Sequence, residues 1–230
     1  MELFGIEKLS LVDYDGKVAS TVFTATCNFL CPFCQNSPLV TDTKNLTPVP
    51  EEEILSYFKT RRGILDGVCI TGGEPTLQKD LPEFCKKVKD LGLSVKVDTN
   101  GTNPDMIKYL VENNLCDYFA VDIKNSKENY AKIIGFKTFD TKKVEKSVEY
   151  LMGCGVDYEF RTTLVKEFHT KKDIENIGKW IKGAKHYALQ QFKDTGSCIE
   201  SGLSPVDEKT AKEFLEIVKK YIPNAKLRGY

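Results

Sequence analysis

Short runs of β-branched and aromatic residues alternate with longer amphipathic stretches from about residue 17 to the end of the chain. The spacing between successive runs leaves room for a helix, and this alternation predicts repeated βα units with a parallel sheet. Eight such units close a full barrel, so six predict an α/β fold with an open, partial, TIM-like (β/α)6 barrel. Its active site would lie at the carboxyl ends of the strands. The six predicted strands are residues 17–24, 67–71, 94–99, 118–123, 158–165 and 187–192.

Helix signals fill the gaps between these runs. Pro50 followed by three glutamates is typical of a first helical turn, where proline fits and acids favour the helix dipole. Apolar residues recur at helical spacing in 81–91 and are followed by a glycine, a common C-terminal cap. Asn103 opens another helix, and Asp207 precedes a further apolar stripe. The stretch 40–49, rich in threonine and proline, predicts a polar loop.

Length and charge narrow the class of protein. The chain has 230 residues, 41% of them hydrophobic, which is enough for one well-filled domain over residues 1–230. Its 33 basic and 33 acidic residues cancel, so overall charge gives no case for binding nucleic acid or an anionic membrane. The N-terminal segment lacks a basic start followed by a long apolar run, and no stretch approaches the length that crosses a bilayer. We therefore expect a soluble cytoplasmic protein.

The eight cysteines divide into one cluster and five single residues. A disulfide scaffold is typical of small secreted chains that lack a core, so reduced thiols are expected here. Three cysteines crowd into eight residues. We expect the other five to be small buried hydrophobic residues: Cys69, Cys85, Cys116, Cys154 and Cys198.

The clustered cysteines, Cys27, Cys31 and Cys34, follow the first predicted strand, where a loop at the carboxyl edge of the sheet enters the ligand crevice. Thiolates are soft ligands that suit iron–sulfur clusters or zinc, and three close cysteines can hold three corners of a cubane. A structural zinc site usually has a closed set of four ligands, and no fourth is evident nearby. An iron corner left open can bind another ligand.

The CxxxCxxC spacing, with Phe33 before the last cysteine and Asn36 after it, resembles the defining motif of the radical S-adenosylmethionine (SAM) superfamily. The resemblance implies a partial barrel of the radical SAM type and a 4Fe–4S cluster on the three cysteines. It implies that SAM chelates the fourth iron and that Phe33 belongs to the cofactor site. One electron then splits SAM into methionine and a 5′-deoxyadenosyl radical, which abstracts hydrogen.

The second predicted strand is followed by Gly72, Gly73, Glu74 and Pro75. Paired glycines let backbone groups approach a ligand closely, although such a turn is as often ordinary turn chemistry. The segment resembles the GGEP motif of the superfamily, which contacts the amino group of SAM. By this resemblance Gly72, Gly73 and Glu74 belong to the SAM site.

Acids also end the third and fourth predicted strands: Asp98 is followed by Thr99, and Asp122 precedes Lys124 by two residues. Read alone, either acid would more often cap a helix. Together they resemble the DTNG and DxK elements of glycyl radical enzyme activases. The resemblance implies that Lys124 approaches the SAM carboxylate, and that Asp98, Thr99 and Asp122 bind a monovalent cation beside SAM.

Arg161 lies inside the fifth predicted strand, where a charged side chain needs a partner, so a salt bridge is the simplest interpretation. The activases carry an arginine on a corresponding strand that reaches SAM, and the resemblance implies that role for Arg161. Gln190 and Gln191, in the sixth predicted strand, are weaker candidates for such a role. For His169 and His186 we expect ordinary structural or surface roles.

Residues 10–17, 21–38 and 227–229 resemble the short activating proteins of anaerobic ribonucleoside-triphosphate reductase, and this resemblance spans nearly the whole chain. It implies abstraction of hydrogen from a glycine Cα on a glycyl radical enzyme, with an electron donor such as flavodoxin or ferredoxin. Asp15 stands where the family usually has proline, and Gln35 where it usually has histidine. Neither is a cluster ligand, but partner choice stays open.

Two alternatives remain. A radical SAM enzyme acting on a small molecule, such as a 7-carboxy-7-deazaguanine synthase, would share the cluster and GGEP motifs. A noncatalytic iron–sulfur or zinc protein would explain the cysteines but not the other motifs. Apart from 40–49, the connections are expected to be about as long as βα units require. A barrel open on one side with few insertions favours a protein segment as substrate.

Overall fold

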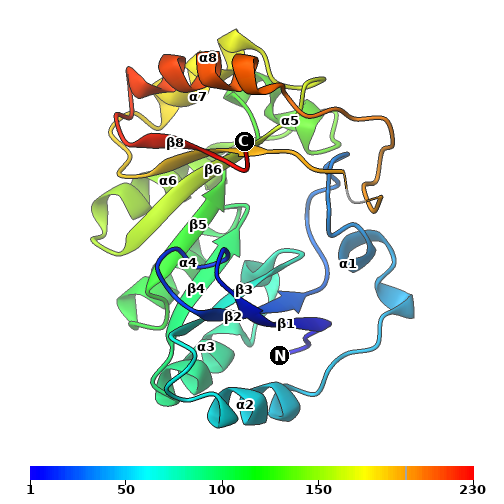
Figure 1. Ribbon diagram of the computed structural model, residues 1–230, viewed down its shortest axis with the longest axis vertical. Helices are drawn as coiled ribbons and strands as arrows, with labels where there is room; N and C mark the ends of the chain where they lie inside the picture. The colour runs from blue at the N-terminus through cyan, green and yellow to red at the C-terminus, as the bar shows by residue number, and fades with distance from the viewer. Residues whose placement is uncertain (195) are drawn as a thin grey trace. The chain divides into compact units, whose positions relative to one another are not determined.

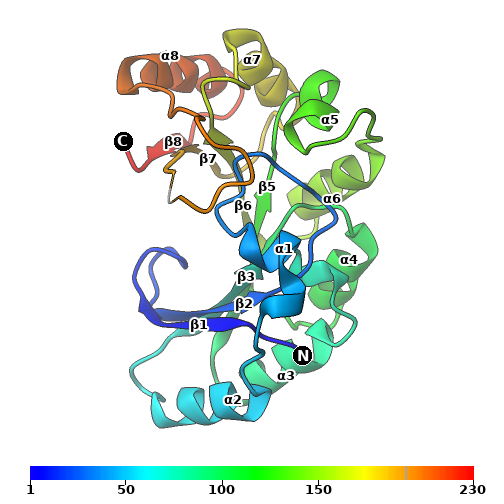
Figure 2. The same ribbon diagram turned by 90° about the vertical axis from the view of Figure 1, so that its right-hand side faces the viewer.

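The computed structural model of the protein describes residues 1–194 and 196–230 (Figure 1, Figure 2). These residues form two compact units, each assembled from separate stretches of chain. The first unit contains Met1–Asn28, Pro38–Thr99 and Asn103–Phe119, and the second contains Phe29–Ser37, Asn100–Thr102 and Ala120–Tyr230. A single domain over residues 1–230 stays a prediction.

The strands of the first unit lie in chain order. β1 (Gly5–Ser10) pairs antiparallel with β2 (Ala19–Thr24), which is parallel to β3 (Gly67–Gly72), and β3 is parallel to β4 (Ser94–Thr99). A further strand, β5 (Tyr118–Asp122), begins in this unit and ends in the second. The helices are α1 (Pro38–Thr41), η1 (Thr43–Asn45), α2 (Glu51–Thr60), η2 (Pro75–Leu77), α3 (Leu81–Asp90) and α4 (Pro104–Glu112).

The helices of the first unit form where the sequence signals predict them. The Asn103 side chain accepts a hydrogen bond from the Met106 backbone N–H at 3.3 Å and so caps α4. One face of α3 is fully buried, and Gly92 follows the helix with a φ of +80°. Both views show α2 and α3 along one side of the strands (Figure 1, Figure 2). The predicted helices at 51, 81–91 and 103 are confirmed.

The strands β6 (Asp157–Leu164), β7 (Tyr187–Gln191) and β8 (Ala225–Arg228) of the second unit are parallel. β6 pairs with β7, and β7 pairs with β8. α7 (Lys171–Trp180) and α8 (Glu208–Lys219) lie side by side in both views, and α8 lies next to β8 (Figure 1, Figure 2). The helices are η3 (Lys127–Asn129), α5 (Tyr130–Ile133), α6 (Lys142–Gly153), α7 (Lys171–Trp180) and α8 (Glu208–Lys219).

The six predicted strands correspond to β2 through β7, whereas β1 and β8 were not predicted. Three of the six residues of β1 are exposed, and β8 has four residues of which only Ala225 is buried. Neither segment therefore carries the apolar run that marks a strand. The expected polar loop at 40–49 is wrong in part, since it contains the end of α1 and all of η1.

The expectation of short connections is also wrong for the second unit. Residues 123–141 separate β5 from α6 and hold two short helices, and residues 192–207 separate β7 from α8. None of the helices in the described part of the chain is long and apolar enough to cross a bilayer.

The single cysteines are only partly as expected. Cys69, Cys85 and Cys116 are buried, and burial raises the pKa of the Cys85 thiol to about 12, so it is inert as a nucleophile. Cys154 and Cys198 are only half-buried, which corrects the expectation of five buried cysteines.

A charged pair ties β8 to β6. Arg228 donates two hydrogen bonds to the Glu159 carboxylate, from Nη1 to Oε1 at 3.1 Å and from Nη2 to Oε2 at 2.7 Å. The Glu159 side chain is only 4% exposed, so it depends on this forked pairing for its charge. The pair compensates for the small apolar area of β8.

Replacing Arg228 with methionine leaves the Glu159 carboxylate buried without this partner. We expect the free energy of unfolding to fall by about 3 kcal/mol, measured by urea unfolding with circular dichroism. The double variant Glu159→Gln/Arg228→Met should lose clearly less, because it buries no unpaired charge. Equal losses in the single and double variants would show that the side chains act through packing instead.

Candidate functional site

The residues predicted to form the site divide between the two units, and each group is described by itself. The first unit holds Cys27, Gly72, Gly73, Glu74, Asp98 and Thr99. The second unit holds Cys31, Phe33, Cys34, Asp122, Lys124 and Arg161.

The glycine turn at the end of β3 packs directly on the backbone that follows β2. The Gly73 N–H donates to the Thr24 carbonyl at 2.8 Å, and Gly72 has a φ of +111°. A Cβ added to Gly73 would lie 2.0 Å from the Thr26 oxygen, and one added to Gly72 would lie 2.3 Å from the Thr24 oxygen. Both glycines are therefore required by a close approach of the chain to itself, whatever ligand the turn binds.

The Glu74 carboxylate is buried and joins the ends of two strands. Its Oε1 accepts hydrogen bonds from the Thr76 N–H at 3.1 Å, the Thr76 hydroxyl at 2.6 Å and the Thr99 hydroxyl at 2.6 Å. Glu74 thus fixes the turn after β3 against the end of β4. The Thr99 hydroxyl, predicted as a cation ligand, donates its hydrogen to this carboxylate.

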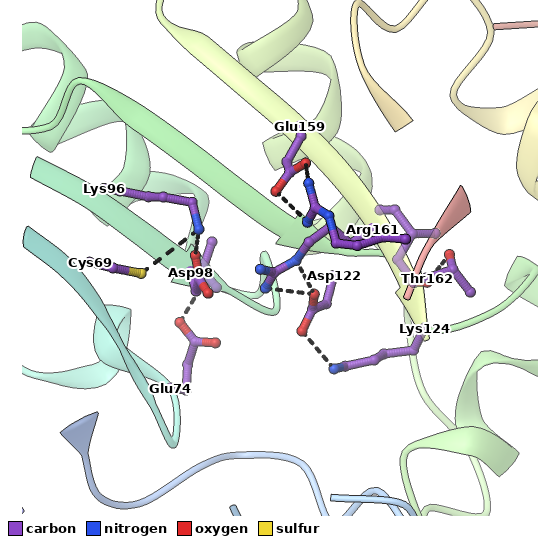
Figure 3. Close-up of polar contacts among 12 residues, drawn as sticks. Cys69, Glu74, Lys96, Asp98, Asp122, Lys124, Glu159, Arg161 and Thr162 are labelled. Atoms are coloured by element: carbon purple, nitrogen blue, oxygen red, sulfur yellow. Dashed lines mark hydrogen bonds and ion pairs between the residues drawn. The ribbon is translucent and has the colours of Figure 1, made fainter. Parts of the chain in front are cut away.

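Asp98 lies beside a buried lysine that the sequence analysis missed. The Lys96 Nζ lies 2.6 Å from Asp98 Oδ1 and 3.8 Å from the Cys69 sulfur (Figure 3). Both Lys96 and Asp98 are on β4, two residues apart, so they share one face of the strand. A lysine between two valines of a predicted strand was the signal that could have revealed it.

Asp122 is held between two cationic side chains in the second unit. The Lys124 Nζ lies 2.9 Å from Asp122 Oδ2, and the Arg161 Nε and Nη2 each lie 3.0 Å from Asp122 Oδ1 (Figure 3). Burial alone would raise the pKa of Asp122, but Arg161 and Lys124 hold it well below its usual range. The same carboxylate holds the pKa of Lys124 above its usual value, against the effect of burial. The salt bridge expected for Arg161 is present.

The loop that carries Cys31 and Cys34 lies next to this charged group. The Cys34 N–H donates to the Cys31 carbonyl at 3.0 Å, which closes a turn, and the Lys124 ammonium lies 5.8 Å from the centre of the Phe33 ring. Phe33 also packs edge-on against Phe192, with ring centres 6.4 Å apart. Burial raises the pKa of the Cys34 thiol, although the Lys124 charge acts in the opposite direction.

Residues from the long connection 192–207 hold the same loop. The Gln35 amide donates to the Lys193 carbonyl at 2.6 Å, and the Glu200 N–H donates to the Pro32 carbonyl at 2.9 Å. The Ser197 hydroxyl donates to the Gln35 carbonyl at 2.7 Å. Gln35, which departs from the family pattern, thus has a structural role of its own.

The residues present are of the side-chain types that a 4Fe–4S cluster and SAM require, although residues 1–194 and 196–230 contain no group of three or more metal-ligating side chains placed together. The three clustered cysteines form no disulfide, and their thiolates are the ligands that iron prefers in iron–sulfur clusters. Asp122, Lys124 and Arg161 together carry one net positive charge, since two cations face one carboxylate. A group of that charge suits an anionic ligand such as the carboxylate of SAM.

His169 was expected to have a structural or surface role, and the structure shows a structural one. Its buried ring accepts a hydrogen bond from the Val165 N–H at Nδ1, at 3.0 Å, so Nε2 carries the proton and donates to the Lys124 carbonyl at 2.9 Å. The ring therefore fixes the backbone at Lys124. His186, in contrast, is exposed.

Comparison with known proteins decides the family. A family model described as the radical SAM superfamily matches residues 21–181. The chain belongs to the radical SAM superfamily. It is 35% identical, over 97% of this chain and 94% of the other, to a protein of Methanocaldococcus jannaschii named "Putative glycyl-radical enzyme activating enzyme MJ1227". It is also 29% identical, over 68% of this chain and 70% of the other, to a 7-carboxy-7-deazaguanine synthase of Clostridium acetobutylicum.

Solved structures show the same fold at low sequence identity. SuiB of Streptococcus suis matches with a TM-score of 0.71 and 15% identity over 92% of this chain, which spans 49% of SuiB. A domain of pyruvate-formate lyase-activating enzyme from Bacteroides vulgatus matches with a TM-score of 0.58 and 17% identity, over 71% of this chain and 99% of that domain. The predicted α/β fold of the radical SAM type is confirmed, and membership of the superfamily implies SAM and a 4Fe–4S cluster.

The buried ring of His169 predicts a pH dependence of stability in this radical SAM protein. Burial lowers the pKa of His169 in the folded chain, although its hydrogen bonds to the backbone act in the opposite direction. Below the ordinary histidine pKa of about 6.5, the unfolded chain therefore binds a proton that the folded chain does not, and stability falls. Urea unfolding between about pH 7 and 5.5 should show this loss in the wild type.

His169→Gln should remove that part of the pH dependence, whereas His186→Gln should keep it, because His186 is exposed. His186 is the matched control because it is the other of the two histidines in the chain. The same pH dependence in His169→Gln as in the wild type would contradict the assignment.

Proposed function

We propose that the protein is a glycyl radical enzyme activase, and that its partner is an anaerobic ribonucleoside-triphosphate reductase. The observation that carries the proposal is the 35% identity, over nearly the full length of both chains, to a protein named as an activating enzyme of this kind. The resemblance of residues 10–17, 21–38 and 227–229 to reductase activases supports the choice of partner.

The residues of the chain take distinct roles in this function. Cys27, Cys31 and Cys34 hold three irons of the cluster, and the turn Gly72–Glu74 binds the amino group of SAM. Lys124 binds the SAM carboxylate, with its ammonium oriented by Asp122 and its backbone by His169. Arg161 reaches SAM from β6 and helps to hold Asp122, while Phe33 lies against the Lys124 ammonium in the cofactor site. When bound, the cluster and SAM supply a radical that abstracts hydrogen from a glycine Cα of the partner.

A protein partner has a second task in this proposal, the exclusion of water and of competing reactions. A primary radical left open to solvent is quenched, so the glycine loop of the partner completes the cavity on binding. An electron donor such as flavodoxin or ferredoxin reduces the cluster.

The monovalent cation of the activases does not fit the residues as they stand. Asp98 is paired with Lys96, and Asp122 is paired with Lys124 and Arg161. No part of the proposed function is therefore routed through a cation.

A small-molecule radical SAM enzyme is the second candidate. The identity to a 7-carboxy-7-deazaguanine synthase over 68% of this chain favours it. Efficient turnover of a pterin-like substrate, with no radical on any reductase, would support this alternative and leave membership of the superfamily unchanged.

The cysteine assignment predicts a single cluster. Anaerobic reconstitution should yield one cluster with about four irons per chain, measured by iron and sulfide analysis and by the visible spectrum. Cys27→Ala, Cys31→Ala or Cys34→Ala should abolish it. Cys69→Ala and Cys154→Ala are the matched controls, and loss of the cluster in either would show that the ligands were misassigned.

The activase proposal predicts a glycyl radical on the partner. Anaerobic incubation of the reconstituted protein with SAM, a reductant and the matched reductase should give a glycyl radical signal in electron paramagnetic resonance. Without the reductase, cleavage of SAM to 5′-deoxyadenosine should be slow. Lys124→Ala should lower both the SAM cleavage and the radical yield by about tenfold or more, because a charge-assisted contact to the carboxylate is lost.

Lys127→Ala is the control for that variant, since Lys127 is paired with Glu145 on the outside of the second unit. It should keep both activities. SAM cleavage with no radical on the reductase would contradict the proposed partner.

A further inference from the structure

The strand β4 places a lysine and an aspartate together in the interior of the first unit. The Lys96 Nζ and Asp98 Oδ1 are 2.6 Å apart, and the side chains are 3% and 13% exposed (Figure 3). A charge-assisted hydrogen bond of this length between largely buried groups is stronger than its surface equivalent. The ammonium is therefore a fixed part of the surroundings of Asp98.

The register of the sheet explains why Lys96 points to Asp98 and stays there. Lys96 is the register partner of Cys69 on β3, and Cys69 is the register partner of Thr21 on β2. Lys96 thus extends over a row of small side chains that leave room for its long stem, and its Nζ lies 3.8 Å from the Cys69 sulfur. A thiol is a weak acceptor, so Asp98 is the strong partner in this group.

A monovalent cation at Asp98 would meet this ammonium. The expected cation site includes Asp98 in the first unit and Asp122 in the second. Asp98 is already paired with a lysine, and Asp122 with a lysine and an arginine. An alkali ion coordinated by Asp98 would lie close to a like charge in a poorly hydrated place, which is unfavourable. The pairing with Lys96 supplies the same unit of positive charge without a bound ion.

We propose that Lys96 is a positioning residue that replaces the monovalent cation, holding Asp98 by a tethered ammonium where related activases would use a free alkali ion. The comparison with activases rests on the proposed function, whereas the pairing of Lys96 with Asp98 does not. It has one direct consequence: the wild-type protein is indifferent to the identity of the alkali cation. Removal of the ammonium creates a vacancy at Asp98 that an alkali ion can fill.

The test compares potassium chloride or sodium chloride with tetramethylammonium chloride at equal ionic strength, since the organic cation is too large to coordinate a carboxylate closely. The measurements are the melting temperature of the full chain and the SAM affinity of the anaerobically reconstituted protein. Neither needs a reductase partner, so a failed activase assay and a failed cation test remain distinguishable. The variants are Lys96→Met and the double variant Lys96→Met/Asp98→Asn.

We expect the wild type to show the same melting temperature and SAM dissociation constant in all three salts. In tetramethylammonium chloride, Lys96→Met should bind SAM about tenfold more weakly than the wild type. Saturating potassium or sodium should recover most of that factor and raise the melting temperature of Lys96→Met by about 4 °C or more. The double variant should show neither recovery, because it has no carboxylate at position 98.

Two results would overturn the proposal. One is a saturable potassium or sodium effect on the wild type, which would mean that an alkali ion binds with Lys96 in place. The other is a folded Lys96→Met that responds equally to all three salts. If Lys96→Met does not fold in any salt, thallium-205 magnetic resonance of the wild type decides: a bound thallium signal overturns the proposal, and its absence at millimolar thallium supports it.

Discussion

A charged side chain inside a sheet is stable only beside a group of opposite charge, and the interior of this protein is arranged around that requirement. In the first unit the pair is Lys96 with Asp98. In the second, Asp122 faces Lys124 and Arg161. None of these groups could lose its partner without leaving a buried charge, so the strand ends that carry them are fixed in register. The charges that prepare the site for a polar ligand are also the charges that hold the strand ends together.

The sequence predicts the parts of this fold that repeat. Six strands and the helices that start at Glu51, Leu81 and Pro104 follow from periodicity and capping, because these signals are local. β1 and β8 do not follow, since their stability comes from neighbours: β8 is fixed by a charged pair between Arg228 and Glu159. For the site, motifs identify the positions but not the partners of each side chain. Lys96 was missed because no motif includes it.

The two glycines at the end of β3 can be explained either by a bound ligand or by the close approach of the chain to itself. The absence of a side chain at Gly73 is required by the Thr26 oxygen, which would lie 2.0 Å from a Cβ. This explanation is complete without any ligand, so the glycines by themselves are weak evidence for SAM. The Glu74 carboxylate is likewise occupied within the chain, by Thr76 and Thr99. What such a turn offers a ligand is its rigid backbone, because the side-chain interactions are already used to hold it.

The hydrogen bonds of Gln35 explain its structural role at a position where the family usually has histidine. Its amide donates to the Lys193 carbonyl at 2.6 Å, and its own carbonyl accepts from the Ser197 hydroxyl. The residue thus fastens the loop of Cys31 and Cys34 to the long connection that follows β7. A neutral histidine has a single ring N–H to donate, whereas the glutamine amide has two hydrogens on a longer stem and can reach a backbone carbonyl across the loop. The substitution therefore changes how the cysteine loop is held and leaves the set of thiol ligands intact, which places the difference from the family in the support of the site and not in its chemistry.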